Sequence, residues 1–221
     1  PAFPVFFLSQ IMSGMDRALG TTFYDTRGGG SGWLYENLFW LMGHPEVYVI
    51  LIPAVAALME MAPVFTRRPL FSFKIAVMGI AGICGLSILV WAHHMYMTGW
   101  APLLNAPFML TTELISIPTG MLFLVLVGTV WRGRLWMTVP TASIFALLLN
   151  FMIGGITGIY LSDVPADAAL HGSMFVTAHF HYTLMGAGLT GAIAALIFWF
   201  PKMTGRMIDK QLSWISFWMV Q

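Results

Sequence analysis

Long apolar stretches alternate with short polar connections along this chain, and charged residues mark where each stretch ends. Residues 75–112, 114–131, 135–162 and 168–201 contain no aspartate, glutamate, lysine or arginine. Stretches of this length suit helices of about 20 or more residues, which cross a hydrocarbon core about 30 Å thick. The pattern therefore predicts an all-α fold, a polytopic transmembrane helix bundle.

About five complete spans and parts of two more are expected from this pattern. The complete spans lie near residues 33–62, 71–97, 107–131, 136–161 and 170–200. Residues 1–15 resemble the end of an earlier span, and residues 211–221 resemble the start of a later one. The chain begins with Pro1 and stops inside an apolar run, so we interpret residues 1–221 as a single transmembrane domain fragment of a longer polypeptide.

Composition agrees with a membrane protein and removes several other classes. The chain is 58% hydrophobic and 9% charged, whereas a soluble domain is about 25% charged. Its mean hydropathy is +0.81. A net charge of +1 gives no signal for nucleic acid, and no nucleic-acid partner is expected. The single cysteine, Cys84, leaves no basis for a disulfide framework or a thiolate metal cluster in these residues.

Basic residues gather in alternate connections between the predicted spans. One set of connections, with the first residues beyond it, holds Arg67, Arg68, Lys74, Arg132, Arg134, Lys202, Arg206 and Lys210. The other set holds only Arg17 and Arg27 among basic residues, together with several aspartates. Cytoplasmic loops of membrane proteins carry an excess of lysine and arginine, so we expect the first set to face the cytoplasm and the second to face outside.

Five of the six histidines lie inside the predicted spans, where ionisable side chains are costly and mark functional sites. They are His44, His93, His94, His179 and His181. The predicted topology places all five in the outer half of the bilayer, where they could converge. One such histidine alone would more often be a hydrogen-bonded packing residue, but five together favour a cofactor site.

Helical spacing divides these histidines between two kinds of site. At about 100° per residue, His179 and His181 are about 200° apart and face opposite sides of one helix. This arrangement suggests two cofactors flanking the helix, as with axial haem ligands. His93 and His94 could reach one ion from the end of their helix, with His44 as a third ligand. Three imidazoles with one open position suit copper or zinc.

The segment GHPEVY, residues 43–48, adds two further candidates near this site. His44 and Tyr48 are four residues apart, so they share one helical face. Glu46 lies about 200° from His44 on the same helix. A buried carboxylate there could hold and pass on a proton, and the alternative is an acid that is hydrogen-bonded to a neighbouring helix.

Three hydroxyl side chains on another predicted span share one helical face. They are Thr112, Ser116 and Thr119. They could line a hydrated proton path, or they could simply donate hydrogen bonds to carbonyls of their own helix. The sequence leaves both possibilities open.

Five segments of the chain carry a family resemblance: LYENLFWLMGHPEVYV, VWAHHM, IPTG, GGITGI and VTAHFHY. In this order and spacing they resemble subunit I of the haem–copper terminal oxidases, the cytochrome c oxidase subunit I family. The resemblance covers essentially the whole chain. It implies central helices of a twelve-helix subunit in a terminal respiratory oxidase. Such enzymes reduce dioxygen to water with four electrons and couple this reaction to transmembrane proton translocation.

The resemblance also implies two haems, one high-spin and one low-spin, and one copper ion. His44, His93 and His94 look like the copper ligands. His179 resembles the proximal ligand of the high-spin haem, and His181 resembles a ligand of the low-spin haem. Implied partners are dioxygen, the lipid bilayer, other oxidase subunits including an electron-accepting one, and cytochrome c or quinol as donor.

Further residues match functional positions of the family. Tyr48 resembles the tyrosine that is covalently joined to a copper-ligating histidine and donates an electron and a proton. Glu46 resembles the acid at the inner end of one proton-uptake path. Asp167 and His171 match positions near the haem propionates and a magnesium site. The implied location is a prokaryotic plasma membrane, with the mitochondrial inner membrane less favoured.

The sequence departs from the family pattern at two positions. His171 is followed by Gly172, where the family has an aspartate, and this weakens the expectation of a magnesium ion. Leu122 stands where the family has the lysine of a second proton path. In addition, the second axial ligand of the low-spin haem is expected upstream of Pro1, because the other intramembrane histidines are already assigned.

Two other functions remain as alternatives. One is nitric oxide reduction by a member of the same superfamily, against which Tyr48 argues. The other is a metal transporter with a histidine-lined path, against which the opposite-facing His179 and His181 argue, because a path should line one face of a helix.

Overall fold

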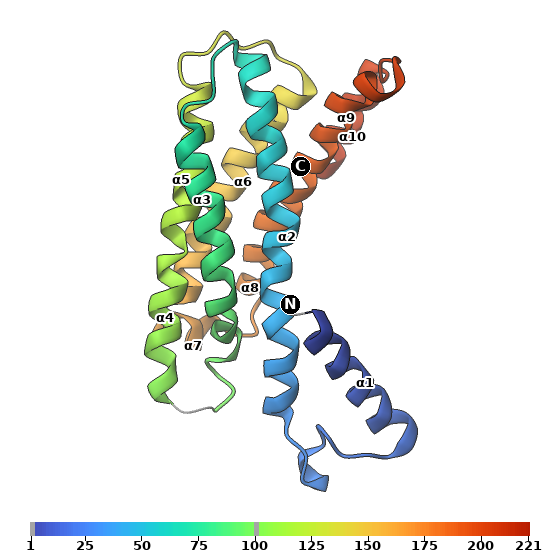
Figure 1. Cartoon of the computed structure of the whole chain (residues 1–221), viewed down its shortest axis with the longest axis vertical. Helices are drawn as coiled ribbons and strands as arrows, with labels where there is room; N and C mark the ends of the chain where they lie inside the picture. The colour runs from blue at the N-terminus through green and yellow to red at the C-terminus, as the bar shows by residue number, and fades with distance from the viewer. Residues whose placement is uncertain (1–2, 100–101) are drawn as a thin grey trace.

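The computed structural model describes residues 3–99 and 102–221, and these residues form helices and no strand (Figure 1). The α-helices are α1 (Phe3–Leu19), α2 (Gly32–Thr66), α3 (Phe73–Leu86), α4 (Asn105–Leu114), α5 (Ser116–Val130), α6 (Val139–Ser162), α7 (Val164–Leu170), α8 (Met174–Phe180), α9 (Thr190–Thr204) and α10 (Lys210–Val220). The 3-10 helices are η1 (Thr26–Gly28), η2 (Ser87–Leu89), η3 (Trp91–Met95) and η4 (Pro102–Leu104), and η5 (His181–Leu189) is a π-helix. The predicted all-α transmembrane bundle is confirmed.

Four helical segments are long and apolar enough to cross a membrane, and they match four of the predicted spans. They are Gly32–Thr66, Asn105–Val130, Val139–Ser162 and Met174–Thr204. Along the long axis of the molecule α2, α3, α5 and α6 run beside one another, and α1 packs against the first half of α2 (Figure 1).

The remaining predicted span, residues 71–97, is correct in position, but it is not one continuous α-helix. α3 ends at Leu86, and residues 87–95 continue as the 3-10 helices η2 and η3. The Ser87 hydroxyl donates to the carbonyl of Cys84 at 3.0 Å, and such back-bonding competes with the regular helix and bends it. The expected span 71–97 therefore ends in tight turns, and the segment WAHHM lies in one of them.

α2 is the long central helix from which much of the site is built. It begins after Ser31, whose side chain accepts a hydrogen bond from the backbone N–H of Leu34 at 3.2 Å. Its 35 residues extend about 52 Å at about 1.5 Å per residue, more than the hydrocarbon core of about 30 Å. The helix is therefore long enough to extend beyond such a core.

The connections lie at two ends of the bundle, as the alternation of charge predicts (Figure 1). At the basic end, the Arg68 guanidinium donates to the carbonyl of Trp131 at 2.5 Å, and the Arg134 N–H donates to the carbonyl of Thr66 at 2.9 Å. These bonds join two of the basic connections. At the other end, the Asp16 carboxylate accepts hydrogen bonds from the loop that precedes α2.

The core of the bundle is aliphatic and lies toward the basic end. The largest buried side chains there include Leu58, Met61, Leu126, Ile144 and Leu147, all less than 2% exposed. α3 approaches α5 closely because Gly79 has no side chain: a Cβ there would lie 2.6 Å from Cδ2 of Leu122. Leu122 is itself buried in this contact.

Candidate functional site

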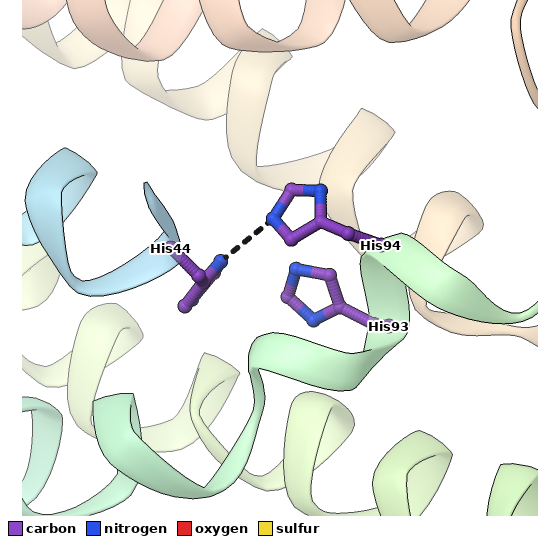
Figure 2. A group of neighbouring side chains, drawn as sticks. All are labelled: His44, His93 and His94. Carbon is purple, nitrogen blue, oxygen red and sulfur yellow. Dashed lines mark hydrogen bonds between the residues drawn. The ribbon is translucent and has the colours of Figure 1, made fainter. Parts of the chain in front are cut away.

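Three histidines from two elements converge in the half of the bundle away from the basic connections (Figure 2). We call this half the outer half and the half toward the basic connections the inner half. His44 projects from α2, and His93 and His94 project toward it from η3. Their ligand nitrogens all lie within 4.8 Å of one another. The ring centroids are 4.4 Å apart for His44 and His93, 5.3 Å for His44 and His94, and 4.4 Å for His93 and His94. The predicted convergence of these three residues is confirmed.

The local backbone explains how two adjacent histidines reach the same place. In a regular α-helix, two adjacent side chains point about 100° apart around the helix axis. Here they lie on a short 3-10 helix at the end of the α3 segment, so the backbone turns beneath them and both rings project toward α2 (Figure 2).

Hydrogen bonds determine which nitrogen of His93 is free. The Thr112 hydroxyl donates to the carbonyl of Phe108 at 2.6 Å and lies 3.0 Å from Nδ1 of His93. Since that hydroxyl hydrogen is already used, Thr112 accepts from the Nδ1–H of His93. The Nε2 atom of His93 then carries a lone pair and can bind a metal. Outer partners of this kind commonly orient metal-ligating histidines.

The other two ligands contact each other. Nδ1 of His44 lies 3.1 Å from Nε2 of His94. Nε2 of His44 is buried and has no hydrogen-bond partner within the described residues, although buried polar atoms are rarely left unpaired. The facing pair, Nδ1 of His44 and Nε2 of His94, fits a metal ion, because an ion held between them would accept a lone pair from each.

Two aromatic rings of α2 pack against histidines of this group. Tyr48 packs against His44, with ring centroids 4.9 Å apart and planes at 70°, as the spacing of four residues predicts. Trp40 stacks on His94, with centroids 3.7 Å apart and planes at 6°. The Trp40 Nε1–H donates to Oε2 of Glu36 at 2.8 Å. Neither Trp40 nor Glu36 was among the predicted site residues, although their spacing of four and eight residues before His44 is visible in the sequence.

His179 is held against α6 by its Nδ1 atom. Nδ1 lies 2.8 Å from the carbonyl of Gly154 and 3.3 Å from the Thr157 hydroxyl. A carbonyl can only accept, so Nδ1 carries the hydrogen and Nε2 is free to bind a metal. Gly158 makes room for the ring, because a Cβ there would lie 2.8 Å from Cε1 of His179.

His181 is oriented in a similar way on another side of its helix. Its Nδ1 atom donates to the carbonyl of Thr177 at 2.8 Å, which also leaves Nε2 free. His181 is exposed, whereas His179 is half-buried and packs against α6. α8 ends at Phe180 and the π-helix η5 begins at His181, and π-helical turns occur frequently at functional sites. The two histidines therefore present free nitrogens in different environments.

Glu46 is not buried, although the sequence predicts a buried acid at this position. It is exposed, on the face of α2 that also carries the exposed side chains of Val49 and Ile50. The packed face of α2 instead carries His44 and Leu51. The expected burial of Glu46 is therefore not found among the described residues of this chain.

The three hydroxyls of the suggested proton path are not linked to one another. Each donates to a carbonyl of its own helical segment: Thr112 to Phe108 at 2.6 Å, Ser116 to Glu113 at 2.5 Å and Thr119 to Ile115 at 2.7 Å. This is the simpler of the two possibilities that the sequence left open. Only Thr112 also reaches the histidine group.

Asp167 and His171 form a pair near the outer connections. The Asp167 carboxylate is buried and lies 3.1 Å from Nδ1 of His171. Burial raises the pKa of Asp167, and the neighbouring imidazole opposes part of this shift. Within the described residues, a group of three possible metal ligands forms only at His44, His93 and His94, so the pair by itself gives no support for a magnesium site.

The chain is similar to known proteins over nearly its whole length. The model of the family "Cytochrome C and Quinol oxidase polypeptide I" matches residues 1–221. The chain is 44% identical to "Cytochrome c oxidase subunit 1" of Corynebacterium efficiens and 41% identical to "Probable cytochrome c oxidase subunit 1-beta" of Nocardia farcinica, each over 98% of the chain and over 37% and 36% of the relative. It is 39% identical to "Probable quinol oxidase subunit 1" of Staphylococcus haemolyticus, over 99% of the chain and 33% of the relative.

The chain thus spans a little more than a third of the length of most of these relatives, and a third of the quinol oxidase subunit. The match extends over the histidine group, the helix of His179 and His181, and the apolar spans between them. From its sequence and its helical architecture, the chain belongs to the family of cytochrome c and quinol oxidase polypeptide I, the haem–copper oxidoreductases of the respiratory chain.

Proposed function

We propose that this chain contributes the catalytic centre of a terminal oxidase that reduces dioxygen to water with four electrons and couples the reaction to proton translocation. The observation that carries the proposal is the set of histidine nitrogens left free for metals. His44, His93 and His94 form one group, and His179 and His181 present separate free Nε2 atoms.

The residues fit a copper ion and two haems. His44, His93 and His94 would hold copper, because an all-imidazole set suits this metal. His179 would bind the high-spin haem and His181 the low-spin haem. When bound, these groups supply the one-electron redox chemistry that the side chains lack. The protein orients each imidazole through its other nitrogen or its ring face, and it surrounds the site with aromatic and aliphatic side chains.

Tyr48 would act as a donor of a proton and an electron at the centre. Its ring packs directly against His44, and a phenol can give up both a proton and an electron. The unpaired Nε2 of His44 also supports a covalent link between the two rings, which would replace an imidazole N–H and a ring C–H bond of Tyr48 and would need dioxygen, the proposed substrate, as the two-electron oxidant. A mass spectrum of the peptides from the full-length subunit tests the link: His44 and Tyr48 should be recovered in one cross-linked peptide if the link forms.

Proton delivery is assigned to Glu46 rather than to the hydroxyls near Leu122. A small cavity beside Leu122 is lined mainly by aliphatic and aromatic side chains, and the hydroxyl of Thr119, its polar lining residue among those described, already donates to Ile115. Apolar cavities of this kind hold no stable water. An uncovered carboxylate at membrane depth is costly, so we propose that Glu46 is covered in the assembled oxidase and passes protons inward.

Two variants separate these routes. Glu46→Gln should slow reduction of the haem–copper centre and the later proton uptake in the assembled oxidase, whereas Thr119→Val should leave both nearly unchanged. Stopped-flow spectroscopy measures the first process, and a pH indicator dye measures the second. Blocked reduction in Thr119→Val with normal reduction in Glu46→Gln would contradict this assignment.

The electron donor would be cytochrome c or quinol, since relatives carry both names. The chain would act with other oxidase subunits, including one that accepts electrons, and residues 1–221 would form a single transmembrane unit. Its apolar spans and its bacterial relatives support a place in a bacterial plasma membrane.

Spectra of the assembled enzyme test the proposed function as a whole. A reduced-minus-oxidised spectrum should show two haems, metal analysis should show copper, and oxygen consumption should follow addition of reduced cytochrome c or quinol. His179→Leu should abolish carbon monoxide binding, and His181→Leu should first remove the low-spin band. Non-haem iron with nitric oxide consumption would contradict the proposal, as would metal uptake without haem.

A further inference from the structure

A row of four side chains along α2 leads to the histidine group. Glu36, Trp40, His44 and Tyr48 follow one another at intervals of four residues, so they lie on one slowly turning face of the helix. His44 is a proposed copper ligand and Tyr48 a proposed donor. Glu36 and Trp40 belong to neither group, and their contacts require a separate explanation.

The indole of Trp40 is held at its edge and on its face. Its Nε1–H donates to Oε2 of Glu36 at 2.8 Å, one turn earlier on the same helix. Its ring lies nearly parallel to His94, 3.7 Å away between centroids. Gly43 leaves room for the indole along α2, because a Cβ at that position would lie 3.0 Å from Cε3 of Trp40.

The stack joins two elements, because Trp40 lies on α2 and the proposed ligand His94 lies on η3. His93 is oriented by a hydrogen bond from its Nδ1 atom to Thr112. For His94, the indole of Trp40 lies flat against one face of the imidazole ring. A hydrogen bond to a carboxylate is stronger than one between neutral groups, so Glu36 restricts the rotation of the indole and thereby the plane of the His94 ring.

We propose that Glu36 is a positioning residue of the metal centre, which holds Trp40 flat against His94 and so sets the orientation of one of the three ligands. The inference rests on the proposed copper site. Partners outside the ligand set commonly change metal affinity by about 10–100-fold when they are removed, and a similar change is expected here.

Copper retention by the assembled oxidase tests this role without relying on turnover. The purified enzyme is exposed to increasing concentrations of a copper chelator, and the copper that remains per haem is measured by mass spectrometry. Glu36→Leu removes the acceptor and should lose copper at about 10–100-fold lower chelator concentration. Glu36→Gln keeps an acceptor oxygen but accepts a weaker hydrogen bond, so it should retain copper better than Glu36→Leu. Glu60→Leu changes an exposed glutamate elsewhere on α2 and is the matched control.

Trp40→Phe provides a second test that does not alter Glu36. It keeps an aromatic ring over His94 but removes the N–H donor, and it should weaken copper retention as Glu36→Leu does. This variant decides the question if Glu36→Leu fails to assemble. Wild-type retention in either Glu36→Leu or Trp40→Phe would overturn the inference, as would equal losses in Glu36→Gln and Glu36→Leu. A wild-type oxidase without copper would instead overturn the proposed function, and this inference with it.

Discussion

The outer and inner halves of the bundle share the helix α2 but bury different kinds of side chain. In the outer half, α2 presents His44 and Tyr48 to the two histidines of η3, and a buried imidazole nitrogen is left without a partner. In the inner half, the same helix presents Leu58 and Met61 to a core of aliphatic side chains that are almost completely buried.

The difference indicates that the inner half supplies stability to a fold whose outer half carries the reactive side chains. Unpaired buried polar atoms are costly, so the histidines of the outer half do not by themselves stabilise the fold. In the inner half the buried side chains are mostly apolar and closely packed, and among the described residues the Ser143 hydroxyl is the buried polar group there without a partner. Leu122 belongs to this apolar half, where the family resemblance leads one to expect a lysine. Stability and chemistry are therefore expected to respond to different substitutions.

The largest effect should follow removal of a ligand from the outer half. His93→Leu should reduce copper affinity by more than about 100-fold, beyond what loss of a supporting partner costs, and oxygen reduction should stop. Copper analysis of the assembled oxidase checks the result. His171→Leu is the control, because His171 lies outside the histidine group and should keep the copper.

A second test separates metal binding from chemistry within the outer half. Tyr48→Phe retains the ring that packs on His44 but removes the phenolic hydroxyl. Loss of a proton donor typically costs about 100-fold to 10,000-fold in rate, so oxygen consumption should nearly cease while copper content stays at the wild-type level. Normal oxygen consumption in this variant would remove Tyr48 from the mechanism.

The third test addresses the inner half. Leu126 is 1% exposed, and Leu126→Ala should lower the free energy of unfolding by about 2–5 kcal/mol through lost contacts and a cavity. Copper content in the folded fraction should be unchanged. Leu124→Ala is a matched control on the same helix, since Leu124 is 61% exposed and its loss should change the free energy of unfolding by less than about 0.5 kcal/mol. Denaturant unfolding in detergent measures both.

The smallest expected effect concerns the contact between α3 and α5. Gly79→Ala places a Cβ 2.6 Å from Leu122 and 3.0 Å from the carbonyl of Pro118, and overpacking of this kind costs about 1–3 kcal/mol. Gly85→Ala on the same helix meets nothing within 4 Å and should be neutral or slightly stabilising. If the two variants unfold alike, the helices are not as closely packed as the structure indicates.

The amino-acid sequence alone determined the membrane class, the positions of the spans and the membership of the histidine group. Charge-free stretches of about 20 residues have few folded solutions in a bilayer, and five intramembrane histidines are hard to explain without cofactors. The spacing of His44 and Tyr48 is a local property of one helix, so their contact could be predicted before the fold was known.

Only the tertiary structure decided how these residues are oriented. The contact of His44 with His94 joins residues 50 positions apart, and the bond of His179 to Gly154 joins two helices. The stack of Trp40 on His94 and the exposure of Glu46 likewise depend on which elements pack together. Helical periodicity gives the direction of a side chain from its own axis, whereas its partners, its free nitrogen and its burial depend on the neighbouring helices.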